Sequence, residues 1–61
     1  MMELTEKELS VMQDLLTEEE LLVKKFNMLA EHCSDPKVKQ QMQDISNKHQ
    51  SHFNSIFSYL Q

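Results

Sequence analysis

The 61-residue chain contains no glycine and only one proline. β-Hairpins and tight turns usually depend on these residues, because glycine adopts the positive φ angles that many turns require and proline presets a turn angle. Their scarcity favours an all-α fold with few turns. A chain of this length forms one domain at most, and its stability is marginal without help from a metal, a disulfide or a partner.

Other absences narrow the class of protein. The single cysteine, Cys33, has no second cysteine to pair with, which indicates a reducing compartment and predicts a cytoplasmic protein. The segment MMELTEKEL is acidic and does not resemble a signal peptide. No stretch approaches the ~20 apolar residues of a membrane-spanning helix, so we expect no membrane association.

Positive charge is also scarce. Six lysine and arginine residues stand against ten acidic residues, and eight of the acids lie within residues 1–33. The chain has no basic patch, so we expect no nucleic-acid partner. It has no glycine-rich phosphate loop. Ser51 and His52 are adjacent helical residues that point about 100° apart, so they do not form a nucleophile–base pair. We therefore expect no enzyme activity unless a bound metal supplies the chemistry.

The first helix is predicted from its start signal. Thr5 is a suitable N-cap, and Glu8 completes a capping box. Apolar residues then recur in alternating steps of three and four, as the a and d positions of a heptad do. They are Leu9, Met12, Leu16, Val23, Phe26, Ala30 and Cys33, and Leu15, Leu22 and Leu29 widen the stripe on one flank. The segment TEEE at 17–20 could begin a second helix, but the unbroken heptad favours one helix over about 5–33.

The segment CSDPK holds the strongest break in the chain. Asp35 can cap a helix and Pro36 suits the first helical position. The residue before a proline disfavours helical angles, so the turn is placed at 34–35 and a second helix at about 36–59. Its inner positions are Val38, Met42, Ile45, His49, His52, Ile56 and Tyr59, widened by Phe53 and Leu60, with Phe57 off this face.

These elements predict a single antiparallel helical hairpin over residues 1–61. One hairpin leaves much of both apolar stripes exposed, and two hairpins would close a four-helix bundle. A stripe as wide as that of the first helix can contact two neighbouring helices. We therefore expect a homodimer, with a helical tetramer or docking onto a larger helical protein as the alternatives.

Three polar residues interrupt the heptads. Glu19 takes a d position of the first helix, and His49 and His52 take consecutive a and d positions of the second. With the turn near 34–35, residues whose numbers add up to about 69 lie at the same height, so Glu19 is level with both histidines. A two-fold dimer would bring a second set to the same layer.

The predicted layer has two interpretations. Histidine nitrogen and carboxylate oxygen suit Zn, Fe, Mn, Ni or Cu, so Glu19, His49 and His52 are candidate metal ligands, with Zn or Fe as the candidate ions. Alternatively, the layer is a Glu–His hydrogen-bond network that sets the register of the bundle. His32, at the end of the first helix, is expected to be exposed or to favour the helix C-terminus.

The segments EELLVKKFNMLAE and MQDISNKHQSHFNSIFSYL resemble one helical hairpin of the ferritin-like superfamily, in particular rubrerythrin-type domains and the spore coat protein F family. The resemblance covers about residues 4–60. In metal-binding members, each hairpin supplies a Glu from its first helix and a Glu-x-x-His from its second. Glu19 and His52 match these positions, whereas His49 stands where the pattern has Glu, which disfavours a di-iron centre and leaves a mononuclear or zinc-type site.

The segment DPKVKQQMQDISNKHQSHF resembles the coat-protein branch, which implies spore association in a spore-forming bacterium and no catalysis. The expected function is therefore that of a small, self-associating and non-enzymatic helical protein. Metal binding by Glu19, His49 and His52 in the dimer core is the first alternative. An adaptor that docks onto a larger helical protein is the second.

Overall fold

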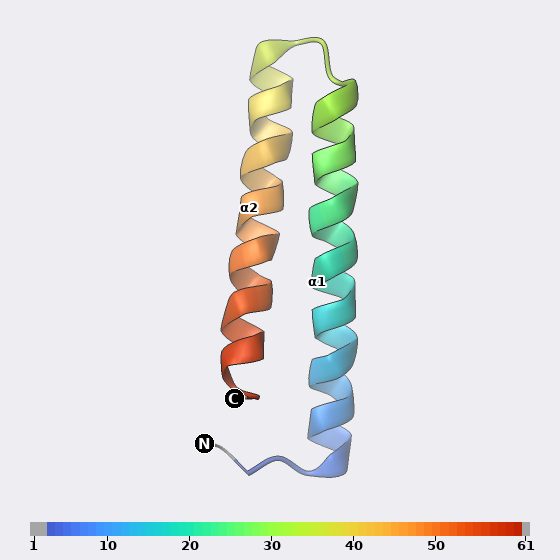
Figure 1. The fold of residues 1–61 in the computed structure, drawn as a ribbon, viewed down its shortest axis with the longest axis vertical. Coiled ribbons are helices and arrows are strands. Elements are labelled where there is room, and N and C mark those ends of the chain that lie inside the picture. Colours follow the sequence, from blue (N-terminus) through green and yellow to red (C-terminus); the bar gives the residue numbers. More distant parts are fainter. Residues whose placement is uncertain (1–2, 61) are drawn as a thin grey trace.

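The computed structural model describes residues 3–60, which form two antiparallel α-helices joined by a short turn (Figure 1). Helix α1 spans Glu6–His32 and helix α2 spans Pro36–Ser58. The predicted all-helical hairpin is confirmed, and α1 continues through the TEEE segment without a break. The ranges predicted from the sequence were about 5–33 and 36–59.

The start of α1 is stabilised by the capping box. The Glu8 backbone N–H donates to the Thr5 hydroxyl at 3.1 Å, and the Thr5 backbone N–H donates to the Glu8 carboxylate at 3.0 Å. The hydrogen bond from the Thr5 backbone and then that of its side chain lower the pKa of Glu8 from its ordinary value of 4.5. The two partners satisfy backbone and side-chain groups that helix formation alone leaves unpaired.

The turn is equally local in origin. Cys33 is the C-cap of α1, and its backbone N–H donates to the Ala30 carbonyl at 3.2 Å. The Asp35 carboxylate accepts from the backbone N–H groups of Lys37 at 2.8 Å and Val38 at 3.2 Å, directly at the start of α2. Because Pro36 has no N–H to satisfy, it fits the first helical position.

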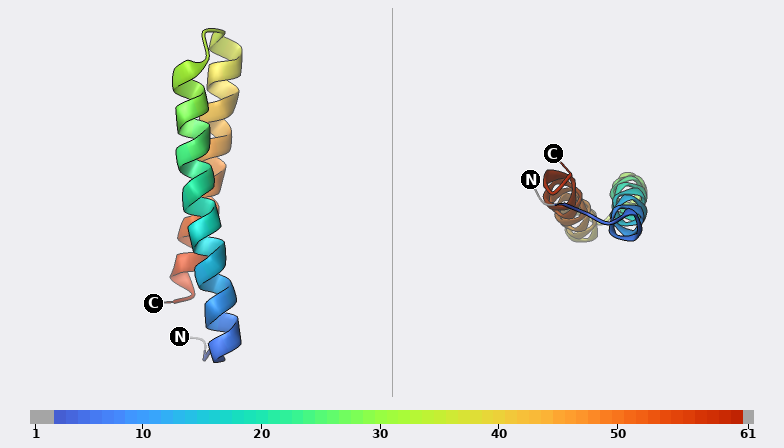
Figure 2. Two further views of the ribbon diagram at one scale, coloured as in Figure 1. Left: turned by 90° about the vertical axis from the view of Figure 1, so that its right-hand side faces the viewer. Right: turned by 90° about the horizontal axis from the view of Figure 1, so that it is seen from below.

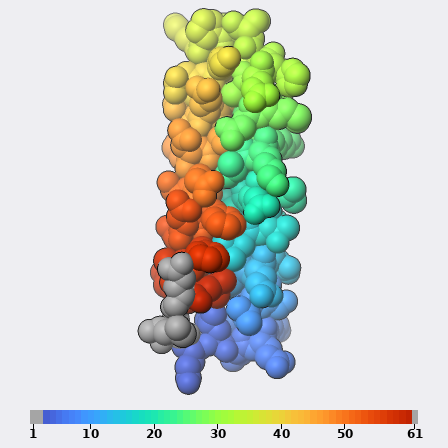
Figure 3. Space-filling view, in the orientation of Figure 1, coloured from blue at the N-terminus to red at the C-terminus, as the bar shows by residue number. Residues whose placement is uncertain are grey.

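The hairpin is one layer thick. The chain extends over 46 × 16 × 11 Å, and the view from below shows two helices side by side (Figure 2). The helices contact each other along their length (Figure 3). Of residues 3–60, only Ala30 and Ser46 are buried, with 1% and 2% of their surface exposed. The hairpin therefore has a seam between its helices rather than a closed core.

The seam of α2 differs from the predicted one. Ser46 lies in it and donates its hydroxyl to the Val23 carbonyl at 3.1 Å. Val38 and Tyr59, predicted as inner positions, are 40% and 52% exposed, and His52 is exposed as well. The half-buried residues of this helix are Met42, Ile45, His49, Phe53 and Ile56, and Leu60 beyond its end is half-buried too. The helix is thus turned about its axis so that Ser46 and Phe53 face α1, and the opposite edge of its stripe is left uncovered.

One side of the hairpin is apolar and uncovered. Its α1 stripe consists of Val11, Leu15, Leu22 and Leu29, and its α2 stripe of Val38, Ile45, His52 and Tyr59. Residues four or seven apart lie on the same side of a helix, so each stripe is continuous. Val11 and Tyr59 line the same hollow at the open end of the hairpin, which places both stripes on one side of it. We call this surface the open face.

The open face holds most of the exposed large apolar side chains. Five of the nine such residues among 3–60 belong to it: Val11, Leu15, Leu29, Val38 and Tyr59, with exposures of 52%, 42%, 36%, 40% and 52%. No helix within residues 3–60 is both long and apolar enough to cross a membrane.

Candidate functional site

The predicted Glu–His layer forms at mid-height of the hairpin. Glu19 is the central residue of the 27-residue helix α1, and His49 and His52 lie nearly one turn apart on α2. The structure brings together the three residues that the heptad exceptions singled out. The hydrogen bond from Ser46 to the Val23 carbonyl confirms the predicted register one turn away.

The Glu19 carboxylate contacts both imidazole rings. Its Oε1 lies 2.6 Å from Nδ1 of His49, and its Oε2 lies 3.3 Å from Nδ1 of His52. An ionised carboxylate only accepts, so in the hydrogen bond with His49 the imidazole Nδ1–H donates to Glu19. The His52 contact is a close approach of opposite polarity and not a hydrogen bond. Both oxygens of Glu19 are therefore directed at histidines of α2, and neither contacts a helix cap or a lysine.

The two histidines differ in how firmly they are held. The His49 ring stacks on Phe26, with ring centroids 5.7 Å apart and 17° between the planes. It also meets the His52 ring edge-on, at 5.5 Å and 87°. The side chains of Glu19 and His49 are 16% and 22% exposed, whereas that of His52 is 58% exposed. His52 lies at the edge of the cluster, on the open face.

The cluster has the composition of a transition-metal site. Glu19, His49 and His52 each offer one ligand atom, and these atoms lie within 4.8 Å of one another. A zinc ion with three protein ligands keeps a fourth position for water or another group. The arrangement supports either an ion held by all three side chains or the hydrogen-bonded layer described above.

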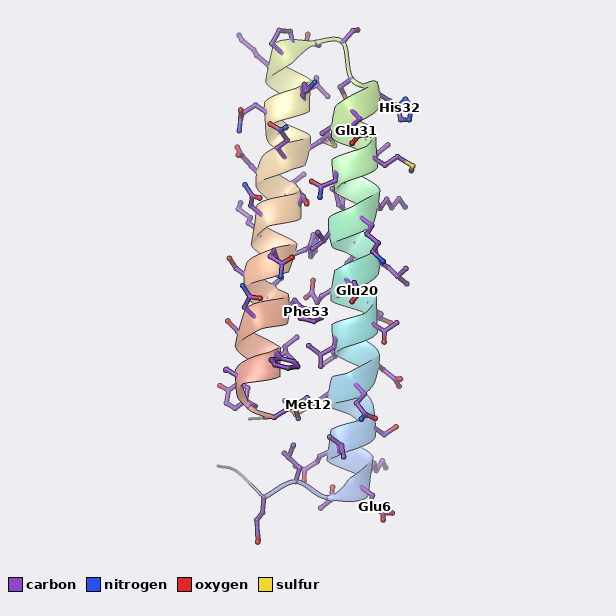
Figure 4. The ribbon with its side chains drawn as sticks, in the orientation of Figure 1. Glu6, Met12, Glu20, Glu31, His32 and Phe53 are labelled. Carbon is purple, nitrogen blue, oxygen red and sulfur yellow. The ribbon has the colours of Figure 1, made fainter. Side chains whose placement is uncertain are left out.

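The other histidine has no part in the cluster. His32 is exposed in the last turn of α1 and points away from α2 near the turn (Figure 4). Its position is the one expected for a residue that favours the negative end of the helix dipole. Cys33, the next residue, is half-buried. It lies at the turn end of α1, whereas the Glu–His layer lies at the middle of that helix.

Sequence reasoning missed two neighbours of the cluster. The stacking of Phe26 on His49 was not predicted, although Phe26 was placed in the stripe. Ser46 was not predicted at all, because a serine in a polar run gives no apolar signal. Its position three residues before His49 on the same helix was the one available indication that it faces α1.

Two hollows lie outside the cluster. The first, of about 520 Å³, is lined by Leu4, Lys7, Glu8, Val11, Met12 and Tyr59 at the open end of the hairpin. The second, of about 380 Å³, is lined by Glu20, Val23, Lys24, Gln50 and Phe53, of which Glu20 and Phe53 are marked in Figure 4. Neither contains Glu19, His49 or His52.

Comparison with known proteins adds no relative. No family model matches the chain, and no curated protein or solved structure is significantly similar to it.

Proposed function

We propose that the chain is a self-associating, non-catalytic helical protein, in which two hairpins pair through their open faces into a four-helix bundle. The observation that carries this proposal is the state of the core: of residues 3–60, only Ala30 and Ser46 are buried, while the apolar stripes of the open face stay uncovered. Apolar surface of this kind is stabilised by removal from water, and a second helical layer removes it.

The size of the exposed surface fits a second copy. A folded monomer of 7.2 kDa exposes about 4,100 Å², whereas this chain exposes 4,927 Å². The excess of about 800 Å² equals the area that each partner buries in a typical stable complex. The broad side of the hairpin measures 46 by 16 Å, an area close to that of such an interface.

The charges of the two helices also favour a second copy. Helix α1 carries seven acidic residues and three lysines, whereas α2 carries three lysines and one aspartate. An acidic helix is stabilised next to a basic one, so each α1 should lie beside α2 of the partner subunit as well as beside its own α2. A dimer of identical hairpins supplies that arrangement for both subunits at once.

We propose spore association in a spore-forming bacterium as the cellular role, supported by the resemblance of residues 4–60 to the spore coat protein F family. A structural role of this kind needs self-association and no catalytic group. Docking onto a larger helical protein is the competing explanation of the open face, and it predicts that the free chain stays monomeric.

The test is the native mass of the untagged chain in chelator, measured by sedimentation equilibrium. The wild type is expected to be a dimer. The double substitution Leu15→Lys with Leu29→Lys introduces charge on the open face and should give a folded monomer. A matched control, Leu21→Lys with Met28→Lys, alters two other exposed apolar residues of α1, 60% and 51% exposed, and should remain dimeric.

Two outcomes would refute the proposal. A wild-type chain that is monomeric at all concentrations would favour the adaptor. A control pair that dissociates the dimer as fully as the open-face pair would place the interface elsewhere on α1.

Metal-ion binding is a second candidate function, favoured by the convergence of Glu19, His49 and His52 within 4.8 Å. The nitrogen and oxygen donors suit Zn or Fe of the divalent ions. Elemental analysis of the untagged protein purified without chelator is expected to show bound metal, and His52→Ala is expected to lose it. Less than about one tenth of an ion per wild-type chain would refute this candidate, because a specific structural site stays largely filled during purification.

A further inference from the structure

The Glu–His cluster lies where a second copy would cover it. His52 is one of the eight residues of the open face, and its side chain is 58% exposed in the single hairpin. Along its own stripe, His52 lies about two turns from Ile45 on one side and about two turns from Tyr59 on the other, so apolar side chains flank it above and below. Any partner hairpin on this face therefore meets the cluster directly.

The height of the cluster makes it symmetric in the dimer. Glu19 is the central residue of α1, with thirteen helical residues on each side. Two hairpins that overlap completely can run parallel or antiparallel, and in both arrangements the middle of one lies level with the middle of the other. The two clusters thus face each other whichever two-fold axis relates the subunits.

The negative charge of the two Glu19 carboxylates favours a bound cation at the centre of the proposed dimer. Glu19 is already 84% covered in the single hairpin, since its side chain is 16% exposed. Closing the open face would bring two such carboxylates into one layer away from water, and like charges in a low dielectric repel each other. A divalent cation held by the same side chains removes that repulsion.

The ligand count points in the same direction. One chain offers three donors, and a zinc-type ion takes four ligands at about 2.0–2.1 Å. In the proposed dimer, His52 of the partner subunit lies on the facing surface. As the most exposed of the three donors, it is the group best placed to reach the fourth position on the ion. The 2.6 Å contact between Glu19 and His49 would open slightly to admit the ion.

We propose that a divalent transition-metal ion binds between the two copies at the centre of the open face, through Glu19, His49 and His52 of one subunit and His52 of the other, and thereby strengthens the dimer. This inference rests on the proposed dimer and adds to it a ligand and a linkage. Because the ion binds the dimer more tightly than the monomer, it must shift the monomer–dimer equilibrium by the same factor.

The test measures the dimer dissociation constant of the untagged chain by sedimentation velocity, once in EDTA and once with one equivalent of ZnCl2 per chain. Zinc is expected to lower the dissociation constant at least about tenfold. Titration with CoCl2 is expected to show the intense visible absorption of four-coordinate Co²⁺, and the signal should follow the dimer fraction rather than the total chain concentration.

Three variants make the test specific. His52→Ala removes a proposed ligand, so its dimer dissociation constant should be the same in EDTA and in ZnCl2, whatever its value in EDTA. Glu19→Gln keeps the shape of the side chain and should also abolish the response. His32→Ala removes the exposed histidine near the turn and should respond as the wild type does.

The outcomes separate this inference from the proposed function. A dimer in EDTA whose dissociation constant is unchanged by ZnCl2 overturns the inference and leaves the dimer in place. Zinc that binds monomers and dimers equally overturns it too. A chain that stays monomeric with and without ZnCl2 overturns both proposals.

Discussion

The contact between Glu19 and His49 makes a prediction that can be worked out in detail. The two atoms are 2.6 Å apart, and the side chains are 16% and 22% exposed, so both groups have given up most of their water to make it. Replacing one partner of such a pair strands the other, whereas replacing both by leucine restores the apolar heptad. The two changes should therefore be strongly non-additive.

The magnitudes follow from what each variant leaves behind. His49→Leu leaves the Glu19 carboxylate with His52 as its remaining partner, at 3.3 Å, and we expect a loss of about 2 kcal/mol, below the usual range for a fully buried pair. Glu19→Leu leaves the His49 ring without its acceptor, but it removes the half-buried carboxylate and adds an apolar side chain to the seam, so we expect a net gain of about 1 kcal/mol. The double variant should gain about 2 kcal/mol, as replaced buried pairs often do.

The assay is urea unfolding followed by far-UV circular dichroism, in EDTA and at one protein concentration, because dimerisation makes the stability depend on concentration. The expected coupling between the two positions is about 3 kcal/mol, which is at the upper end for residues in contact. Effects that add up to within about 0.5 kcal/mol would show that the pair contributes nothing specific. A double variant less stable than the wild type would refute the view that the layer is a polar interruption of an apolar seam.

Three further predictions concern the hairpin itself. Ser46→Ala should lower the free energy of unfolding by about 1 kcal/mol, because the hydrogen bond to the Val23 carbonyl is lost. Ser46→Leu should lower it by about 2 kcal/mol, because the larger side chain forces the helices apart. Urea unfolding measures both effects. Asp35→Ala should lower it by about 1 kcal/mol in the same assay, because two backbone N–H groups at the start of α2 lose their acceptor. The lowered pKa of Glu8 means that the folded state binds fewer protons there than the unfolded state does. The contribution of Glu8 to stability is therefore complete above the ordinary pKa of 4.5 and is lost as the pH falls through the folded pKa. Glu8→Gln should flatten this part of the stability–pH curve, and an unchanged curve would contradict the assignment.

The candidate site shows how far sequence reasoning extends. The three polar exceptions to the heptads, together with the position of the turn, were sufficient to predict that Glu19, His49 and His52 meet. This worked because helical rise is constant, so heights along two antiparallel helices follow from residue numbers alone. What stays a prediction is the identity of the occupant, because the same three side chains satisfy each other in the absence of an ion.

The rotation of each helix about its own axis was predicted less well. The apolar stripes of both helices are wider than one neighbour can cover, so several rotations bury a similar apolar area. Val38 and Tyr59 were assigned to the seam, and they lie on the open face instead. The two buried residues among 3–60 are both small, Ala30 and Ser46, and an apolar pattern does not single out such residues as seam positions.

The sequence by itself determined the features of this protein that depend on near neighbours along the chain. The helix starts at Thr5 and Asp35 arise from hydrogen bonds that span two or three residues, and the turn arises from the geometry of Pro36. The tertiary structure alone decided which edge of each stripe is covered and which is left as the open face. That choice is made by the packing of one helix on the other, since a contact such as that of Ser46 with Val23 joins residues 23 positions apart, and no local pattern encodes it.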